Sequence, residues 1–497
     1  MIMKKNILKK KIVIIPVAFL LLYLALSIPG TGKKTYTTAA KKPFTWNLDQ
    51  LWTSLEKRFQ GAKKSGCEKL KEQIDNTFTR IDDILNILAD SPKTPDDVNF
   101  IHIEKEMFNL APMIAVCDRR LPEYIALCSR VRKIVKQQSL NWNMKVESSR
   151  NRVYRLLYGG RAALEEVMLQ VPPNKIPNLV LVENVPSKTP MADILGVNIH
   201  SGDILVSRGG APTSALIARG NDYPGNFSHI ALVYVDEKTH LISIIESHIE
   251  KGVTITTPGD YLNDKKLRVM VLRLRPDLAG LLKDPMLPHH AAQYALQDAN
   301  ARHIPYDFEM DYKNHDKIFC SEVASAAYKK FGIDLWMGIS SISTPGLASW
   351  LGDFGVINFE TQEPSDLEYD PQLKVVAEWR DRETLYHDHL DNAIIDVMLE
   401  GAEKGDRLTY PWYLLGAARI AKVYSGLLNL WGGIGPIPEG MSPTAALKHS
   451  QFTKRHDNLK KQLVIKANNF KKKYGYPPPY WELINLARNT KPRGNGY

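Results

Sequence analysis

The chain has 497 residues, 44% of them hydrophobic, and a formal net charge of +11. At about 100–200 residues per domain, this length predicts two or three domains with hydrophobic cores of their own. The four cysteines show no CxxC spacing, which argues against a zinc site, a redox pair or a disulfide scaffold.

The N-terminus combines a basic cluster with an apolar run. Five lysines among residues 4–11 precede Ile12–Ile28, seventeen residues without a charge. In the first region, residues 1–43, this pattern predicts a cytoplasmic lysine cluster, a membrane anchor over residues 12–28 and a linker. The bulk of the chain would then lie on the extracytoplasmic side, in the periplasm or cell envelope, where nucleic acid is not an expected partner. A cleaved signal peptide is the alternative, because small residues at Ala25 and Ser27 suit a cleavage site.

The next region, residues 44–174, has the periodicity of helices. Apolar residues recur at steps of three and four, most clearly over residues 74–88. The pattern predicts a helical bundle. Cys67, Cys117 and Cys128 fall inside it, where we expect small buried thiols.

Prolines between residues 171 and 190 end the helical pattern and open a strand-rich region over residues 175–380. Two strand-like runs within it, residues 228–235 and 240–247, are separated by a loop of polar residues. If residues 236–239 form the turn of a hairpin, His229 lies directly opposite Glu246 on the same face. The alternative is that both are polar residues at the solvent-exposed ends of their strands. A register shift of one residue would also place them on opposite faces.

Cys320 stands where a short apolar run changes into a predicted helix over residues 321–331, which Gly332 ends. At a helix N-terminus, the positive end of the helix dipole and a nearby imidazolium would lower the pKa of the thiol towards that of reactive cysteines. A buried cysteine packed under Phe319 and Tyr328 is the alternative, and the position in the helix does not decide between them.

The last region, residues 381–497, is predicted to be a helical extension with a disordered tail. Within it, residues 410–431 are apolar, but Arg419 and Lys422 interrupt them, which argues against a second membrane span. An amphipathic helix fits better, either packed on the neighbouring domain or resting at a membrane surface. The run His387–His389 is expected on a solvated helix face and not in a metal site.

Five pieces of sequence in the strand-rich region occur in an order that resembles a known family. They are SGDIL at residues 201–205, FSHIALV at 227–233, IIES at 244–247, IPYDF at 304–308 and FCSEVASAAY at 319–328. Together they resemble the circularly permuted, YiiX/YaeF-like branch of the NlpC-type papain-like hydrolases. The resemblance implies an α+β fold in which an antiparallel sheet packs on a cysteine-bearing helix, flanked here by the N-terminal helical bundle and the C-terminal helical extension.

The resemblance also implies roles for individual residues. Cys320 would be the nucleophile, His229 the general base and Glu246 the group that orients the imidazole. Tyr306 matches a tyrosine that lines the substrate site, and Gly202 and Asp203 match a structural opening of the first strand. We consider His248 as a reserve for the third position, because it lies two residues after Glu246 on the same strand face.

Three classes of function follow from these patterns. The first is a membrane-tethered cysteine amidase or peptidase whose substrate is a small-molecule, lipid-acyl or wall-peptide amide. The second is an acyltransferase of lipid acyl groups on a related fold, and the third a non-catalytic binding or scaffold protein. The sequence shows no cofactor motif or metal-ligand spacing, so we expect neither; the oligomeric state and the exact substrate stay open.

Overall fold

The structure of this protein, a computed structural model, describes residues 19–30, 36–46 and 48–490. The lysine cluster and residues 12–18 of the expected anchor lie outside the described residues, as do residues 491–497 of the expected disordered tail. Residues 19–26 are helical. Within the described parts of the chain, no helix combines the length and the apolar character needed to cross a bilayer. The membrane anchor therefore stays a prediction.

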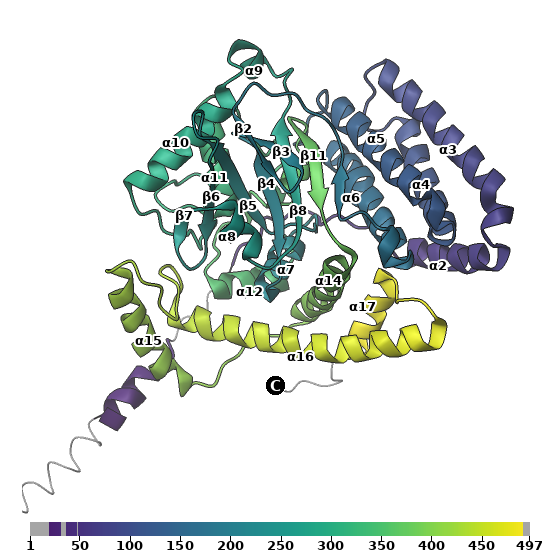
Figure 1. Cartoon of the computed structure of the whole chain (residues 1–497). Helices are drawn as coiled ribbons and strands as arrows, with labels where there is room; N and C mark the ends of the chain where they lie inside the picture. The colour runs from purple at the N-terminus through teal and green to yellow at the C-terminus, as the bar shows by residue number, and fades with distance from the viewer. Residues whose placement is uncertain (1–18, 31–35, 47, 491–497) are drawn as a thin grey trace, which may run out of the picture.

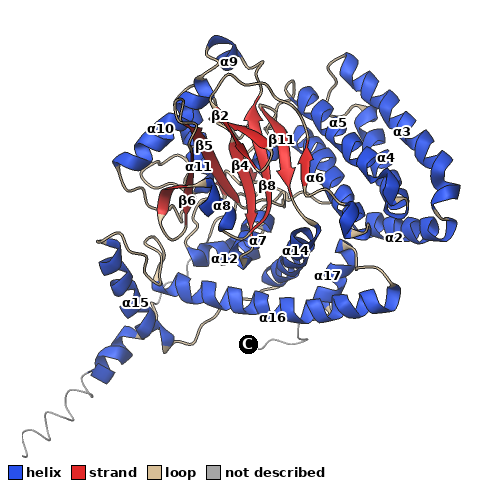
Figure 2. Cartoon of the chain, in the orientation of Figure 1, coloured by secondary structure: helices blue, strands red, loops and turns tan. Residues whose placement is uncertain are grey.

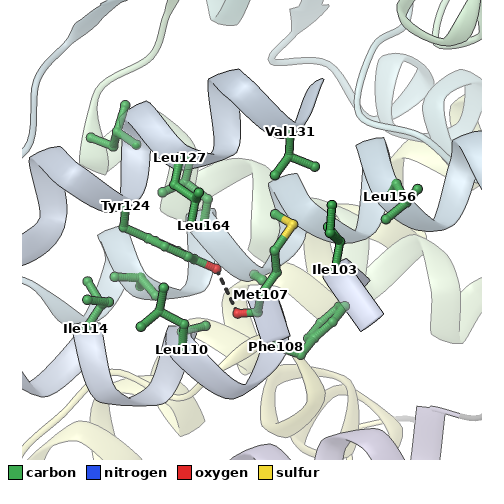
Figure 3. Close-up of a cluster of buried hydrophobic side chains, with 14 of the residues drawn as sticks. Ile103, Met107, Phe108, Leu110, Ile114, Tyr124, Leu127, Val131, Leu156 and Leu164 are labelled. Carbon is green, nitrogen blue, oxygen red and sulfur yellow. Dashed lines mark hydrogen bonds between the residues drawn. The ribbon is translucent and has the colours of Figure 1, made fainter. Parts of the chain in front are cut away.

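The N-terminal helical region consists of α2 (Leu48–Ser65), α3 (Cys67–Asp90), α4 (Val98–Val116), α5 (Leu121–Ser139) and α6 (Glu147–Gln170) (Figures 1 and 2). In α3 the buried side chains recur at helical spacing, as at Ile74, Ile81 and Leu85. Figure 3 shows the centre of this core, where the Tyr124 hydroxyl donates a 3.2 Å hydrogen bond to the carbonyl oxygen of Met107. The helical periodicity of the sequence is borne out here.

A disulfide joins Cys67, the first residue of α3, to Cys117, which follows α4. The expectation that these two residues are buried thiols was therefore wrong. The two cysteines are 50 residues apart in the sequence, and only the antiparallel packing of α3 against α4 brings them together. Cys128 and Cys320 are free thiols.

The central sheet has seven antiparallel strands in the order β1-β11-β8-β4-β5-β6-β7. The strands are β1 (Leu179–Leu181), β4 (Ile204–Gly209), β5 (His229–Val235), β6 (Ile242–His248), β7 (Gly252–Thr256), β8 (Lys266–Leu274) and β11 (Leu373–Trp379). One face packs on α10 (Leu287–Ala301) and α11 (Cys320–Lys329). The other face is covered by a hairpin of β2 (Met191–Ile194) and β3 (Val197–His200) and by α8 (Pro258–Asn263). This mixed architecture confirms the predicted α+β class.

The remaining helices extend the molecule beyond the sheet. They are α7 (Pro212–Arg219), α9 (Ala279–Lys283), α12 (Pro345–Phe354), α13 (Asp366–Tyr369), α14 (Arg382–Glu403), α15 (Leu414–Asn429), α16 (Pro443–Tyr474) and α17 (Tyr480–Arg488). A separate apolar core joins α14, α16 and α17 to α7 and α12. The long α16 runs beneath the sheet region, and α15 projects beside it next to the N-terminal helical residues (Figure 1).

A buried ion cluster lies where α6, the sheet and α14 meet. Arg268 of β8 forms ion pairs with Glu165 of α6 and Asp388 of α14. Asp388 also lies 3.1 Å from the Arg208 guanidinium of β4, and His389 lies 3.3 Å from Glu165. The expectation of a solvated helix face at residues 387–389 was wrong for Asp388 and His389, because α14 packs that face against the sheet.

Removing the Cys67–Cys117 disulfide should lower the free energy of unfolding by about 2–4 kcal/mol, because the bond restricts the unfolded chain across a separation of 50 residues. Urea titration of the double variant Cys67→Ser, Cys117→Ser checks this value. Dithiothreitol should destabilise the wild type by the same amount and leave the double variant unchanged. A Cys128→Ser variant that responds to dithiothreitol less than the wild type would contradict the assignment.

Candidate active site

The β5–β6 hairpin carries the histidine and the carboxylate that the sequence pairs. Its register places Ala231 opposite Glu246 and Val235 opposite Ile242, two residues away from the predicted register. The turn is longer than expected, since it spans residues 236–241. A shift of two residues keeps every side chain on its original face, so His229 and Glu246 still share a face, as diagonal neighbours.

The Glu246 carboxylate binds two imidazoles and one hydroxyl. His229 Nε2 lies 2.7 Å from Glu246 Oε2, and His248 Nε2 lies 3.1 Å from Oε1. The Thr256 hydroxyl of β7 donates a 2.8 Å hydrogen bond to Oε1. The rings of His229 and His248 are 5.4 Å apart. Glu246 and His248, the two candidates for the group that orients the His229 imidazole, therefore belong to one cluster with Glu246 at its centre.

The protonation states of this cluster follow from burial and hydrogen bonding. Burial lowers the pKa of His229, and the hydrogen bond to Glu246 offsets this only in part. Burial also acts to raise the pKa of Glu246, but hydrogen bonds from His229 and His248 hold it far below its usual value. An ionised carboxylate beside a neutral imidazole requires that His229 donates through Nε2–H. The Nδ1 atom of His229 is then unprotonated and able to accept a proton.

Cys320 is the first residue of α11, and the helix start is fixed by Glu322, whose carboxylate accepts a 3.1 Å hydrogen bond from the Phe319 N–H. The Cys320 Sγ lies 3.9 Å from the carbonyl oxygen of Ser228, the residue before β5, and close to the N–H of Ile230 within β5, which are the two chain neighbours of His229. Among the described residues no hydrogen bond joins Sγ to the imidazole. The sulfur therefore lies against the backbone on either side of the candidate base.

Burial raises the pKa of the Cys320 thiol to about 12, and the hydrogen bond from Ile230 opposes this only weakly. The expectation that the helix N-terminus and an imidazolium lower this pKa was wrong for the protein without substrate. The reason is that the side chain is only 5% exposed and the neighbouring imidazole is neutral. The resting pair is a thiol and a base, not a thiolate and an imidazolium.

A groove of about 1050 Å³ opens over these residues. Its floor includes His229, His248, Tyr306 and Cys320, so the four side chains face a common space. Tyr306 is 9% exposed, its ring packs edge-on against Phe308, and burial raises its pKa well above the usual value. Tyr306 thus lines the groove with Cys320 and His229, and its role beside a substrate stays a prediction.

The sequence analysis missed Glu363, which lines the same groove and is 4% exposed. A carboxylate in a loop between two short elements gives no periodic signal, and in sequence it reads as a solvated side chain. Only the packing of this loop against the middle of α11, where the Ser325 hydroxyl donates a hydrogen bond to the Gln362 side chain, shows that Glu363 lies inside.

His229, Glu246 and His248 also have the spacing of a metal site, since one ligand atom from each lies within 4.8 Å of the others. Two imidazoles and a carboxylate are a donor set that suits several divalent metals. In the structure the imidazole Nε2 atoms face the two carboxylate oxygens. The residues therefore fit either a hydrogen-bonded triad or a metal with three protein ligands.

The fold and the site together define a permuted papain-like domain, in which the histidine strand precedes the cysteine helix. Residues 198–377 match a family model described as permuted papain-like amidase enzyme, YaeF/YiiX, C92 family, which confirms the predicted resemblance over this part of the chain. The family supports a cysteine hydrolase type of function.

Among solved structures, the chain is similar to the crystal structure of metalloprotein yiiX from Escherichia coli O157:H7. The two are 20% identical with a TM-score of 0.29, and the match covers 36% of this chain and 97% of that chain. No curated protein matches the chain.

Replacing Glu246 by Gln should lower the free energy of unfolding by about 2 kcal/mol at neutral pH, because it removes charge-assisted hydrogen bonds. The pKa of Glu246 is lower in the folded state than in the unfolded state, so its stabilisation is complete above about pH 4.3 and is lost as the pH falls through the folded value. Urea titrations should therefore show a gap between wild type and variant that shrinks as the pH falls below about 4.3.

Glu72→Gln, the same change at an exposed position of α3, is the control and should follow the wild type at every pH. A gap between wild type and Glu246→Gln that stays constant with pH would contradict the assignment of an ionised carboxylate.

Proposed function

We propose that this protein is an exported, membrane-tethered cysteine hydrolase that cleaves an amide bond through a thioester intermediate. The observation that supports this most directly is that His229 and Cys320 line one groove, while the buried Glu246 carboxylate binds Nε2 of the same imidazole. Nucleophile, base and orienting group are the parts that acyl transfer by a cysteine requires.

The proposed reaction begins with proton transfer from Cys320 Sγ to His229 Nδ1, since the resting pair is neutral. The thiolate attacks the carbonyl carbon of the amide, and the backbone N–H of Cys320 at the start of α11 stabilises the negative oxygen. The imidazolium then protonates the leaving nitrogen, the C–N bond breaks, and a thioester remains. His229 next removes a proton from water, which attacks the thioester and releases a carboxylic acid and the free thiol. Glu246 keeps the imidazole in the required tautomer throughout.

Export is supported by the N-terminal lysines and apolar run and, independently, by the Cys67–Cys117 disulfide. Disulfides persist in oxidising compartments such as the periplasm and cell envelope and are rare in the reducing cytoplasm. We propose that residues 12–28 tether the protein to the membrane, with a cleaved signal peptide as the alternative.

Two alternatives share the same groove. An acyltransferase would resolve the thioester with an alcohol or amine in place of water. A metal-dependent reaction is favoured by the spacing of His229, Glu246 and His248. In that case the two imidazoles and the carboxylate would hold the ion, which would polarise a carbonyl or activate water.

Cys320→Ala should abolish both amide hydrolysis and labelling by an acyl-type, thiol-reactive probe, mapped by mass spectrometry of the full chain. In the wild type, the labelling rate should hold down to at least about pH 6.5 and fall only at more acidic pH, because burial lowers the pKa of His229 and keeps the imidazole neutral. His229→Ala should remove this plateau, so that labelling rises only as the pH approaches the thiol pKa of about 12.

The control is His240→Ala, at an exposed position in the turn of the same hairpin, which should label like the wild type. Equal labelling of wild type and His229→Ala at every pH would contradict the pairing. Loss of hydrolysis on treatment with a chelator, and its return with added metal, would favour the metal-dependent alternative.

A further inference from the structure

Helix α15 has one face that packs on the protein and one that does not. Leu415, Ala418 and Ser425 are buried. The opposite face consists of exposed aliphatic and aromatic side chains that continue on both sides of the helix: Trp412, Tyr413, Ile420, Val423, Tyr424, Leu427, Leu430, Trp431 and Ile434. Trp431 is 90% exposed. Such a concentration of exposed apolar side chains is unusual for a surface in contact with water.

The N-terminal helical residues continue this face. The Tyr23 hydroxyl donates a 2.5 Å hydrogen bond to the Tyr413 carbonyl oxygen, and the Arg419 guanidinium donates a 2.8 Å bond to the Leu26 carbonyl oxygen. The exposed side chains on this segment are also apolar: Phe19, Leu20, Leu21, Leu22, Leu24 and Ile28. Figure 1 shows the segment running out from the body of the molecule beside α15. These residues and the exposed face of α15 are called the docking face below.

The docking face is joined to the groove by the loop that follows α15. Gly435, Pro436, Pro438 and Met441 line the groove on the side opposite the sheet. The Lys422 ammonium of α15 holds this loop by donating a 2.7 Å hydrogen bond to the Pro438 carbonyl oxygen. The start of α16 completes the wall with Ala446 and His449. This wall lies outside residues 198–377, the part that matches the family.

We propose that the docking face rests on the lipid bilayer and presents the groove to amphiphiles in it, so that an amide attached to an acyl chain is the substrate class. Aliphatic side chains flanked by Trp and Tyr are the composition that lies stably at the boundary between acyl chains and headgroups. The docking face is also continuous with the uncharged run of residues 12–28, which places it where that run would meet a membrane. The docking itself does not depend on the chemistry, whereas the substrate class rests on the proposed function.

Tryptophan quenching in the full-length chain tests the docking. The chain is reconstituted in phosphatidylcholine vesicles whose acyl chains carry bromine near the headgroup, and Trp412 and Trp431 are replaced by Phe together. The double variant should lose most of the quenching that the wild type shows, although seven of the nine tryptophans remain. Trp142→Phe, which changes a buried tryptophan of the helical bundle, should leave the quenching unchanged.

Quenching that survives in the double variant would overturn the docking. A dimer in analytical ultracentrifugation that is dispersed by Leu427→Asp, but not by the control Leu282→Asp on α9, would also overturn it, because a second copy would then cover the face. For the substrate class, Cys320 should react about tenfold or more faster with a dodecanoyl than with an acetyl probe of the same reactive group. Equal rates would overturn the substrate class alone, and loss of all Cys320 labelling would overturn the proposed function instead.

A second inference rests on Glu363 and on a different observation. The backbone around it is fixed, since its carbonyl oxygen accepts 2.9 Å and 3.0 Å hydrogen bonds from the Trp336 indole and the Asp366 N–H. Its side chain is 4% exposed and faces the groove, and within the described residues Oε2 has no hydrogen-bond partner. A buried carboxyl oxygen that is left unpaired costs stability, and this one lies where a substrate would bind.

The surroundings of Glu363 determine its charge. Burial, and next the nearby Asp366, raise the pKa of Glu363 well above its usual value. Among the described residues, Cys320 and Tyr306 of the same groove also interact with it electrostatically. None of the three is a cation, so the side chain is a neutral carboxylic acid with an O–H to donate.

The geometry points to Glu363 as a catalytic residue that donates a hydrogen bond to the carbonyl oxygen attacked by Cys320, opposite the backbone N–H of Cys320. The proposed reaction otherwise supplies this oxygen with only one donor, the backbone N–H of Cys320. The inference rests on the proposed acyl transfer. This role gives a reason for a neutral carboxyl group beside the proposed nucleophile, because an ionised carboxylate there would repel the thiolate.

Glu363→Gln keeps a donor, while Glu363→Leu removes it. Acylation of Cys320 by an ester probe should stay within about threefold of wild type in Glu363→Gln and fall about 10²–10³-fold in Glu363→Leu. Alkylation by iodoacetamide, which forms no oxyanion, should be alike in all three. As the pH rises, the wild type should lose acylation relative to Glu363→Gln, because only the wild-type side chain ionises.

Glu360→Gln, an exposed change in the same segment, is the control and should act like the wild type. Undiminished acylation of Glu363→Leu would overturn the inference, as would a ratio of wild type to Glu363→Gln that does not change with pH. If iodoacetamide no longer labels Cys320 even in the wild type, the proposed nucleophile itself is wrong.

Discussion

The arrangement of the three parts of the chain depends on one buried ion cluster. Arg268 of the sheet lies between Glu165 of α6 and Asp388 of α14. Burial alone would raise the pKa of Glu165, but Arg268 and the other cations nearby hold it well below its usual value. Charges removed from water in this way destabilise any arrangement in which a partner is absent, by several kcal/mol per ion. The cluster therefore enforces one placement of bundle, sheet and C-terminal helices, even where apolar packing alone would tolerate others.

That placement also determines the shape of the groove. The papain-like part supplies Cys320, His229 and Glu246, but the far wall comes from residues 435–450. Helix α14 joins the sheet to these residues, and it is held by Asp388 in the ion cluster and by its apolar core with α16 and α17. The candidate catalytic residues thus lie in the region that matches the family, whereas the groove is completed by residues outside that region.

Local patterns in the sequence were enough for the helical bundle, the hairpin and the helix at Cys320. They predicted that His229 and Glu246 share a face, because the alternation of side chains survives a register error of two residues. They failed where the outcome depends on distant segments: the Cys67–Cys117 pairing, the burial of Asp388 and His389, and the position of Glu363. The raised pKa of Cys320 also depends on distant segments, since burial of the thiol outweighs the local effect of the helix N-terminus.

The raised thiol pKa and the neutral histidine have a common consequence for selectivity. A resting thiolate would react with any electrophile that reaches it, whereas in the proposed mechanism the buried thiol reacts only when a bound substrate lets His229 take the proton. If Cys320 is the nucleophile, as proposed, that difference protects it from small electrophiles. It also makes the walls of the groove part of the catalytic control, because a ligand that fills them brings its carbonyl to Cys320 and excludes water from the proton transfer. In the proposed mechanism, the elements that surround the family region therefore determine which molecules can activate the site as well as which can enter it.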